Sequence, residues 1–368
     1  MTPKRPRLLQ VCNVGQIVGG TAACAWTVTR SLPGFEHLVV FPGAITPETR
    51  RGFEPAVCQT LSRVSTPFLR QHGVDVVLLH NTSPRRVQRE LDVPSVQFLH
   101  SQIDPAPADV TVACSAWLQK RAGGRAEGVL TQAVSRPIRP RSASSCSEPP
   151  RWGVPGQMDN SAARHAAHTL RVGRICTPTV AKWPLAALDL TARLAARYPC
   201  IAWEFVGCPV DQRAAYLQAT GGRSVFWEAS WNARSLFWSW DALLYHNPYL
   251  TESFGRTVAE ALRAGCIPIV DDAGGFREQV APETGFLCRN EQDFADALLS
   301  LKCLERRKQY SDRGRQWADR RFGLEPFSRN LVALLEEANR RFAVRWVNRQ
   351  QRHEIRGESG PSVWTGFS

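Results

Sequence analysis

The sequence predicts an α/β fold in which two doubly wound parallel sheets form separate domains. Short apolar runs alternate with helical patterns through most of the chain, which is typical of parallel sheets with helical crossovers. A stretch rich in proline, serine and arginine, residues 135–168, interrupts this alternation once. The chain has 368 residues, which is long for one hydrophobic core and sufficient for two. We therefore expect domains at 1–150 and 169–325, separated by an irregular interdomain segment at 151–168.

Apolar runs predict the strands of the first domain, because strands buried on both faces of a sheet are continuously hydrophobic. The runs are 7–14, 38–41, 74–79, 95–99 and 110–113. A glycine-rich turn from Gly15 to Gly20 follows the first run, and a helix is expected over 21–31. Ser115 opens a further helix after the last run.

A second α/β series begins near Leu170. Its expected strands are 170–176, 202–207, 225–227, 242–245 and 267–270, and its expected helices are 186–197, 291–303 and 315–322. A closing helix is predicted over 326–345. The remaining residues, 346–368, are polar and basic and are expected to form a disordered tail.

The chain is strongly basic, with 46 Lys and Arg residues against 33 Asp and Glu residues and a net charge of +13. Such a surface favours anionic partners, for example nucleotide diphosphates, acidic glycans or anionic lipids. The basic segment 136–141 contains no aromatic residue for base stacking, 339–356 contains only Phe342 and Trp346, and no RNA-binding motif is present. We therefore expect no nucleic-acid partner.

The cysteines and the N-terminus indicate a cytoplasmic protein. None of the 11 cysteines is in C-x-x-C spacing, which favours reduced thiols over a disulfide framework or a zinc site. The segment after Lys4, Arg5 and Arg7 is too short and too polar for a signal peptide. No apolar run approaches the length of a membrane-spanning helix, so any membrane contact is expected to be peripheral, at the inner face.

The run from Thr251 to Gly265 carries the most specific functional information. Glu252 and Glu260 lie eight positions apart, on either side of a Phe254–Gly255 turn that opens a helix, with Ser253 as the expected N-cap. A helix start offers unpaired N–H groups and a partial positive charge, which suit a phosphate. Two carboxylates flanking that site could hold hydroxyl groups on both sides of a diphosphate, as a nucleotide-sugar requires. Two solvated glutamates on an ordinary βα unit are the alternative interpretation.

This run resembles the E-x7-E signature of the retaining glycosyltransferases of the GT-B fold, in the group 1 (family 4) class. The following residues, 266–278, are similar to the strand and Gly-Gly-x-x-Glu turn of that family, with Gly274, Gly275 and Glu278. The resemblance is strong over 171–290 and weaker over 8–134. It implies two Rossmann-like domains facing a central cleft. It also implies retaining transfer of a glycosyl group from a nucleoside diphosphate sugar, of the hexosyltransferase type, in glycan biosynthesis.

The resemblance also implies roles for residues of the second domain. Glu252 would contact hydroxyls of the donor sugar, and Glu260 would accept hydrogen bonds from the ribose. Arg174 and Lys182 would hold the diphosphate, although their spacing of eight positions is longer than the commonest family spacing. The remaining donor-binding residues would be Ser253, Phe254 and Gly255 around the sugar, Thr257 and Val258 at the distal phosphate, and Trp227 at the base.

Three residues of the first domain complete the implied site. Gly19 and Gly20 would let the backbone approach the sugar diphosphate, and His100, at the end of an apolar run, would face the transferred sugar. His80 follows a comparable run and is expected on the acceptor side. The implied catalytic residues are therefore Glu252, His100, Arg174 and Lys182.

The expected ligands follow from the same resemblance. The donor would be a UDP-, GDP- or ADP-linked sugar, and no other cofactor and no metal are expected, since the sequence contains no D-x-D motif. The acceptor would be a glycan, a lipid-linked sugar or a small molecule, with an anionic membrane as a peripheral partner. Two alternatives stay open: a non-catalytic homologue that binds a nucleotide-sugar as a partner protein, and another GT-B enzyme such as a sugar-nucleotide epimerase.

Overall fold

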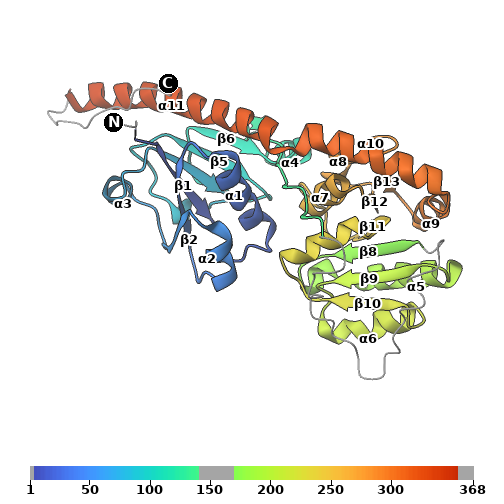
Figure 1. Ribbon diagram of the computed structural model, residues 1–368. Helices are drawn as coiled ribbons and strands as arrows, with labels where there is room; N and C mark the ends of the chain where they lie inside the picture. Colours follow the sequence, from blue (N-terminus) through green and yellow to red (C-terminus); the bar gives the residue numbers. More distant parts are fainter. Residues whose placement is uncertain (1–3, 141–169, 355–368) are drawn as a thin grey trace. The chain divides into compact units, whose positions relative to one another are not determined.

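The chain folds into two compact units that do not follow the predicted boundaries. The computed structural model describes residues 4–140 and 170–354. One unit contains Met1–Ala133 together with Leu324–Ser368, and the other contains Val134–Gly323. The first unit therefore ends before residue 150, and it includes the closing helix (Figure 1). The segment expected to separate the domains, 151–168, lies outside the described residues.

The first unit is built on a seven-stranded parallel sheet of order β3-β2-β1-β4-β5-β6-β7. The order reverses between β1 and β4, so their carboxyl ends meet at the switch point where ligands bind in such sheets. Two of its strands, both at an edge of the sheet, were not predicted. The strands are β1 (Arg7–Cys12), β2 (Glu36–Phe41), β3 (Val57–Thr60), β4 (Val76–His80), β5 (Ser95–Leu99), β6 (Val110–Ala113) and β7 (Gly128–Val129).

The two strands of this sheet that were missed, β3 and β7, lie at its two edges. Edge strands are not buried on both sides and therefore lack a continuous apolar run. Val57 in β3 is 60% exposed, and this strand ends in the polar residues Gln59 and Thr60. The helices of this unit are α1 (Gly20–Ser31), α2 (Pro47–Phe53), α3 (Thr66–Gln71), α4 (Ala116–Arg121), α11 (Leu324–Glu354) and the single turn η1 (Pro84–Arg86).

Helix α11 is longer than the predicted closing helix and packs on the first unit. It begins at Leu324 and continues to Glu354, so residues 346–354 are helical, whereas a tail was predicted there. A stripe of buried side chains at helical spacing faces α1, β5 and β6: Phe327, Leu331, Leu335, Ala338 and Phe342. The rest of the predicted tail, 355–368, lies outside the described residues.

Ion pairs explain why α11 continues beyond its apolar stripe. Arg341, Arg345 and Arg349 recur every fourth residue and therefore share one face of the helix. They pair with Glu127 at 2.7 Å, Asp109 at 2.9 Å and Glu90 at 3.3 Å. The three acidic partners lie more than 200 positions away in the sequence, between residues 90 and 127, so no local pattern could reveal them.

Replacement of Arg345 by alanine is expected to lower the free energy of unfolding by about 1–2 kcal/mol, because the Asp109 carboxylate loses a charged partner while staying buried. Arg340→Ala is the matched control, since Arg340 is exposed and pairs with Glu337 of the same helix. That variant should change stability by less than about 0.5 kcal/mol. Urea unfolding monitored by circular dichroism measures both. Equal losses in the two variants would contradict the anchoring role of Arg345.

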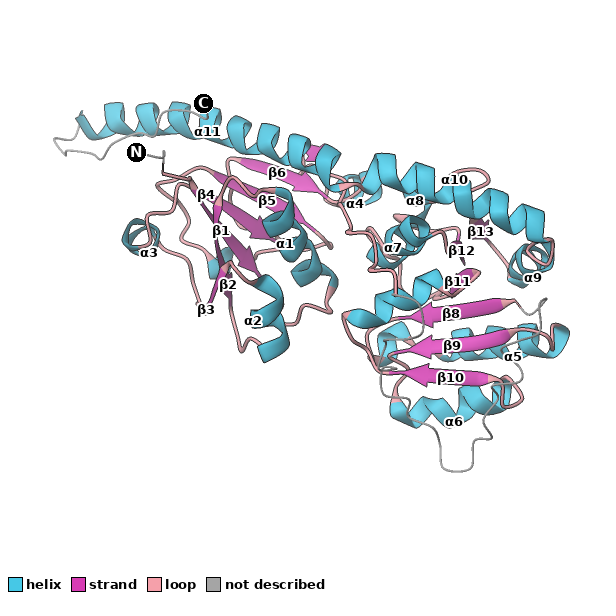
Figure 2. Cartoon of the chain, in the orientation of Figure 1, coloured by secondary structure: helices cyan, strands magenta, loops and turns pink. Residues whose placement is uncertain are grey.

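The second unit has a six-stranded parallel sheet of order β10-β9-β8-β11-β12-β13 (Figure 2). Its order reverses between β8 and β11, which gives this unit a switch point of its own. The three-residue edge strand β13 was not predicted. The strands are β8 (Arg171–Ile175), β9 (Ala202–Val206), β10 (Ser224–Trp227), β11 (Ala242–Tyr245), β12 (Ile267–Asp271) and β13 (Phe286–Cys288).

Helices flank this second sheet and enclose an aromatic core. The core includes Trp183, Trp203, Phe205 and Tyr216, all fully buried. The helices are α5 (Leu185–Arg197), α6 (Val210–Ala219), α7 (Arg256–Ala264), α8 (Phe276–Gln279), α9 (Glu291–Ser300), α10 (Leu304–Phe322), η3 (Val180–Lys182) and η4 (Asn232–Trp238). In the described part of the chain, every helix is too short or too polar to cross a membrane.

Candidate active site

The switch point of the second sheet brings the predicted diphosphate and sugar residues together. Arg174 lies in β8 and Tyr245 ends the neighbouring strand β11. The segments that follow these two strands carry Lys182 and Glu252. Because both strands end at the same edge of the sheet, their loops meet there.

Lys182 and Glu252 form an ion pair between the two loops. The Lys182 Nζ atom donates to Glu252 Oε1, and both side chains keep partial access to solvent, 26% and 20%. The Tyr245 hydroxyl donates to the same carboxylate oxygen at 2.8 Å. Burial and the neighbouring Glu252 carboxylate raise the pKa of Tyr245, so its phenol remains a hydrogen-bond donor. A cation and a carboxylate are thus held side by side, each within reach of solvent.

Arg174 is buried behind this pair, with only 2% of the residue exposed. Its Nη2 atom donates to the Lys182 carbonyl at 2.7 Å, which fixes the η3 turn. The guanidinium carbon lies 5.1 Å from the Trp183 ring centroid and 4.9 Å from that of Tyr245. Within the described residues, its Nε and Nη1 atoms have no hydrogen-bond partner. Two buried N–H donors of a permanent cation are therefore available next to the loop that carries Lys182.

Backbone and side-chain hydrogen bonds hold the two loops in register. The Asn247 amide side chain donates to the Ala181 carbonyl at 2.8 Å, and its backbone N–H donates to Asp271 Oδ2 at 2.6 Å. His246 Nδ1 lies 2.6 Å from the other oxygen of Asp271. Asp271, at the end of β12, thus fixes the start of the loop that leads to Glu252.

Helix α7 begins two residues later than expected, with Gly255 rather than Ser253 as its N-cap. Gly255 has a φ of 82°, in the left-handed region that side chains disfavour, and a Cβ atom there would lie 2.4 Å from Phe276 Cε1. The Val258 N–H, expected to face a phosphate, donates to the Gly255 carbonyl at 2.9 Å instead. The Gly275 N–H donates to the Glu252 carbonyl at 2.9 Å, so the Gly-Gly turn supports the loop that carries Glu252.

Replacement of Gly255 by alanine is expected to destabilise the protein by about 2–3 kcal/mol, from the strained φ and the contact with Phe276. Gly34→Ala is the control, because no atom lies within 4 Å of a Cβ built there and its φ is not positive. Thermal unfolding followed by differential scanning fluorimetry compares the two. A Gly255→Ala protein as stable as the Gly34→Ala protein would contradict the strain assigned to this turn.

Glu260 is buried in α7 and is held by arginines that sequence reasoning missed. Arg234 in η4 donates from Nε to Glu260 Oε2 at 2.8 Å, and Arg256 Nη2 lies 3.5 Å from Oε1. The Arg234 guanidinium carbon lies 3.8 Å from the ring centroid of Trp231. The only hint in the sequence was Glu260 itself, since a buried carboxylate requires a cation or several donors.

Trp227 lies in the core of the second unit and not at an exposed position. It is 8% exposed, and its indole N–H donates to Glu204 Oε2 at 2.9 Å. Glu204 also forms an ion pair with Arg171. Trp227 therefore exposes little of its ring, whereas its expected role in framing a base would require an open aromatic face. Trp231, beside the Arg234–Glu260 pair, is a partly exposed aromatic residue on the segment that follows β10.

In the first unit, the predicted residues gather at the switch point between β1 and β4. Gly19 closes the turn after β1, with its N–H donating to the Gln16 carbonyl at 2.9 Å, and Gly20 begins α1. His80 ends β4, and His100 directly follows β5. Asn81 Oδ1 accepts the His100 N–H at 3.1 Å, which fixes the backbone that carries His100.

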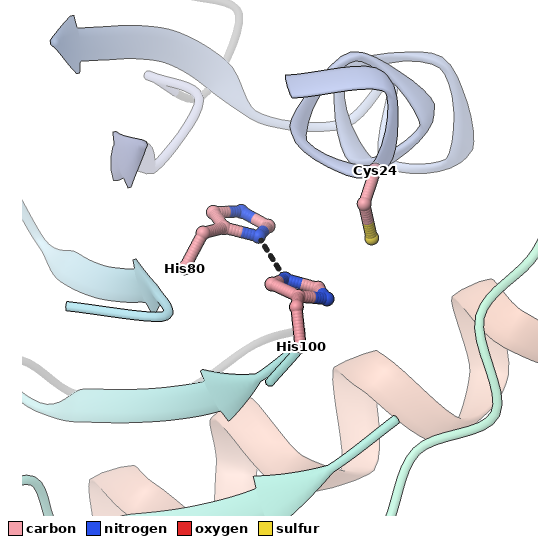
Figure 3. Close-up of side chains that lie close together, drawn as sticks. All are labelled: Cys24, His80 and His100. Carbon is pink, nitrogen blue, oxygen red and sulfur yellow. Dashed lines mark hydrogen bonds between the residues drawn. The ribbon is translucent and has the colours of Figure 1, made fainter. Parts of the chain in front are cut away.

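Both ring nitrogens of His100 have hydrogen-bond partners. His80 Nδ1 lies 3.0 Å from His100 Nε2 (Figure 3), and Gln132 Nε2 lies 2.9 Å from His100 Nδ1. His80 Nε2 in turn lies 2.9 Å from Gln10 Oε1. Burial lowers the pKa of His80 to about 3, so this imidazole is neutral. Gln10, His80 and Gln132 thus form a series of hydrogen-bonded polar side chains that includes His100. The sequence did not predict this series.

Part of the second unit matches a protein family. Residues 229–317, which include the E-x7-E run, match the family described as glycosyl transferases group 1. This match covers less than half of the chain. No curated protein matches the sequence significantly.

Solved structures share the fold of the whole chain. HepE from Anabaena, in complex with UDP-glucose, is 16% identical over 90% of this chain and 99% of its own, with a TM-score of 0.68. A glycosyltransferase from Rickettsia africae is 13% identical over 91% and 99% of the two chains, with a TM-score of 0.66. Sucrose-phosphate synthase from Thermosynechococcus elongatus is 13% identical over 90% and 99%, with a TM-score of 0.63.

These comparisons confirm the predicted fold. The two parallel-sheet, Rossmann-like units match GT-B glycosyltransferase structures along nearly the whole chain. At such low identities the structural likeness concerns the fold alone. The sequence match lies in the unit that carries Glu252 and Glu260. Residues 229–317 therefore match the group 1 glycosyltransferases in sequence, and the fold of the chain matches GT-B structures.

Proposed function

We propose that this protein is a retaining glycosyltransferase of family 4 that transfers a hexosyl group from a nucleoside diphosphate sugar. The observation that carries the proposal is the Lys182–Glu252 pair, which lies at the switch point of the second sheet. Glu252 belongs to the segment that matches the group 1 family. A cation for the diphosphate and a carboxylate for sugar hydroxyls are thus adjacent on facing loops.

Lys182 would act on the leaving group. As the bond between the sugar and the diphosphate breaks, negative charge grows on the departing oxygen, and a preorganised cation stabilises it. The Lys182 ammonium would turn from Glu252 toward the phosphate, which leaves the Glu252 carboxylate to accept hydrogen bonds from sugar hydroxyls. The Tyr245 hydroxyl would keep Glu252 in place during this exchange. The Thr257 N–H, in the first turn of α7, would add a donor to the distal phosphate.

Arg174 requires a movement before it can reach a phosphate. In the structure it lies under the η3 turn and holds the Lys182 carbonyl. We propose that it supports Lys182, and that its two unpartnered N–H groups turn to the diphosphate when the η3 turn shifts. Glu260 would bind the ribose with its carboxylate positioned by Arg234, and Trp231 replaces Trp227 as the aromatic residue proposed to lie near the base.

His100 is proposed to contact the transferred sugar from the first unit, near the turn of Gly19 and Gly20. A sugar hydroxyl would replace Gln132 at Nδ1 and donate to the lone pair there. Among the described residues none is assigned as a covalent nucleophile, and we propose that the acceptor hydroxyl attacks on the face from which the diphosphate leaves. This course retains the configuration of the sugar.

A UDP-linked sugar is the donor that the comparisons favour. HepE was crystallised with UDP and with UDP-glucose, and its fold matches this chain with a TM-score of 0.66–0.68. A thermal-shift screen of UDP, GDP and ADP at equal concentrations tests the assignment. UDP should raise the midpoint most, because a ligand that binds only the native state stabilises it. A larger shift with GDP or ADP would overturn UDP as the donor nucleotide.

The acceptor is proposed to be a glycan or a lipid-linked sugar on the cytoplasmic side. The net charge of +13 favours an acidic acceptor or an anionic bilayer surface. Co-sedimentation with vesicles that contain phosphatidylglycerol, compared with neutral vesicles, tests the lipid-linked form. Equal recovery with both kinds of vesicle would leave the glycan acceptor as the proposal.

Turnover separates the enzyme from a non-catalytic binding protein. Incubation with a UDP-sugar and a set of acceptors should release UDP, and Glu252→Ala should abolish that release. Binding of UDP with no turnover for any acceptor would favour the partner-protein alternative. Analysis of the sugar product separates glycosyl transfer from epimerisation of the donor.

A further inference from the structure

Three side chains from separate elements of the first unit converge at its switch point. Cys24 lies in α1, His80 ends β4 and His100 follows β5 (Figure 3). The Cys24 Sγ atom and one nitrogen of each imidazole all lie within 4.8 Å of one another. Their positions in the sequence match no metal-binding motif, because the fold and not local spacing brings them together.

We propose that Cys24, His80 and His100 bind a thiophilic divalent cation, Zn²⁺ or Co²⁺, through one sulfur and two nitrogens. One thiolate and two imidazoles suit these ions, whereas Mg²⁺ and Ca²⁺ prefer oxygen ligands. Three protein ligands leave a fourth position open. The observations behind this inference concern only groups of the first unit and do not depend on the proposed glycosyl transfer, although the site shares His100 with the proposed sugar contact.

Metal binding requires the ligand atoms, which lie within 4.8 Å of one another, to move by up to about 1.3 Å. With Zn–N near 2.0 Å and Zn–S near 2.3 Å, ligand atoms of a tetrahedral site lie roughly 3.3–3.7 Å apart. The His80 Nδ1 and His100 Nε2 atoms are 3.0 Å apart, so they would separate by a few tenths of an ångström. Cys24 and His80 are fully buried and His100 is partly exposed, so an ion would enter on the His100 side.

The hydrogen-bond chain behind His80 already sets the tautomer that a metal ligand needs. His37 Nε2 lies 2.8 Å from the Leu32 carbonyl, which can only accept, so Nδ1 of neutral His37 is an acceptor. The Gln10 amide nitrogen lies 3.5 Å from that Nδ1 atom, so the Gln10 oxygen is directed to His80. His80 must then carry its proton on Nε2 and direct the bare Nδ1 toward His100 and Cys24.

This arrangement is the usual one for metal-binding histidines, whose other nitrogen donates to a carbonyl oxygen. His100 needs one change, because its Nε2 atom donates to His80 in the metal-free protein. On metal binding its proton moves to Nδ1, and the Gln132 side chain turns to present its oxygen there. The Cys24 thiol loses its proton to solvent, so one proton is released for each ion bound.

The test uses the full chain with the described exposed cysteines replaced, Cys200→Ser and Cys303→Ser, together with Cys146→Ser. Titration with Co²⁺ alone should saturate at one ion per chain and produce a thiolate-to-cobalt charge-transfer band that Zn²⁺ abolishes. Cys24→Ser should remove that band. Cys266→Ser, which replaces a cysteine that is equally buried but lies in the other unit, should leave the band unchanged.

Two further measurements keep the test decisive if a ligand variant folds poorly. Gln10→Leu removes only the side chain that accepts a hydrogen bond from His80. It should weaken Co²⁺ binding by about 10–100-fold, as loss of the hydrogen-bond partner of a metal-binding histidine does in other sites. In weakly buffered solution the unsubstituted chain should release one proton per Co²⁺. Absence of saturation at one ion, a charge-transfer band that survives Cys24→Ser, or binding without proton release would each overturn the site.

Discussion

Replacement of Lys182 by alanine is expected to lower kcat by about 10²–10³-fold, the loss seen when one preorganised group that stabilises the leaving charge is removed. The reason lies in the position of its ammonium group, which the Arg174 contact to the Lys182 carbonyl and the ion pair with Glu252 hold at the sheet edge. Because the charge is needed most as the diphosphate departs, KM should change less than kcat. Initial rates of UDP release from a UDP-sugar measure both constants.

Lys308→Ala is the matched control for this experiment. Lys308 also forms an ion pair with a carboxylate, Asp312, but on the exposed surface of α10. Its replacement should leave kcat unchanged. If Lys182→Ala raised KM without lowering kcat, Lys182 would only bind the donor and would not stabilise the departing diphosphate.

The fold was predictable because its central strands are marked by their composition. The apolar runs that end at His80 and His100 correctly predicted β4 and β5, and the order of the elements indicated two doubly wound sheets. The start of α7 was predicted two residues too early. Ser253 is a favourable N-cap residue, but the positive φ at Gly255 makes that glycine the last residue before the helix.

The parts of the site that were missed depend on contacts between distant residues. Arg234 meets Glu260 from 26 positions away, and the 3₁₀ helix that carries Arg234 has no strong periodic signal. The family resemblance implied that Trp227 lies near the base, with a place in the core as the alternative. It lies in a strand whose partner Glu204 accepts its indole proton, which favours the core. The roles of the predicted site residues in catalysis stay predictions.

Glu260→Gln is expected to lower the free energy of unfolding by about 3–5 kcal/mol, the usual cost of removing one partner from a buried ion pair. The carboxylate is 5% exposed and accepts from Arg234 at 2.8 Å, while Arg256 lies 3.5 Å away with a side chain that is 7% exposed. Glutamine keeps the size of the side chain but removes the negative charge that faces both guanidinium groups. Urea denaturation of the whole chain, monitored by tryptophan fluorescence, measures the loss.

Two comparisons establish whether the charge itself is responsible. Glu228→Gln breaks a pair with Arg213 in which the carboxylate is 49% exposed, and it should cost less than about 1 kcal/mol. Combining Glu260→Gln with Arg234→Gln should restore part of the loss, because the cation that pairs with Glu260 at 2.8 Å is then gone as well. If the two substitutions were instead additive, Glu260 and Arg234 would not be coupled in the folded protein. A carboxylate that two arginines hold in place is also preorganised for the ribose, so Glu260→Gln should reduce the thermal shift produced by UDP as well.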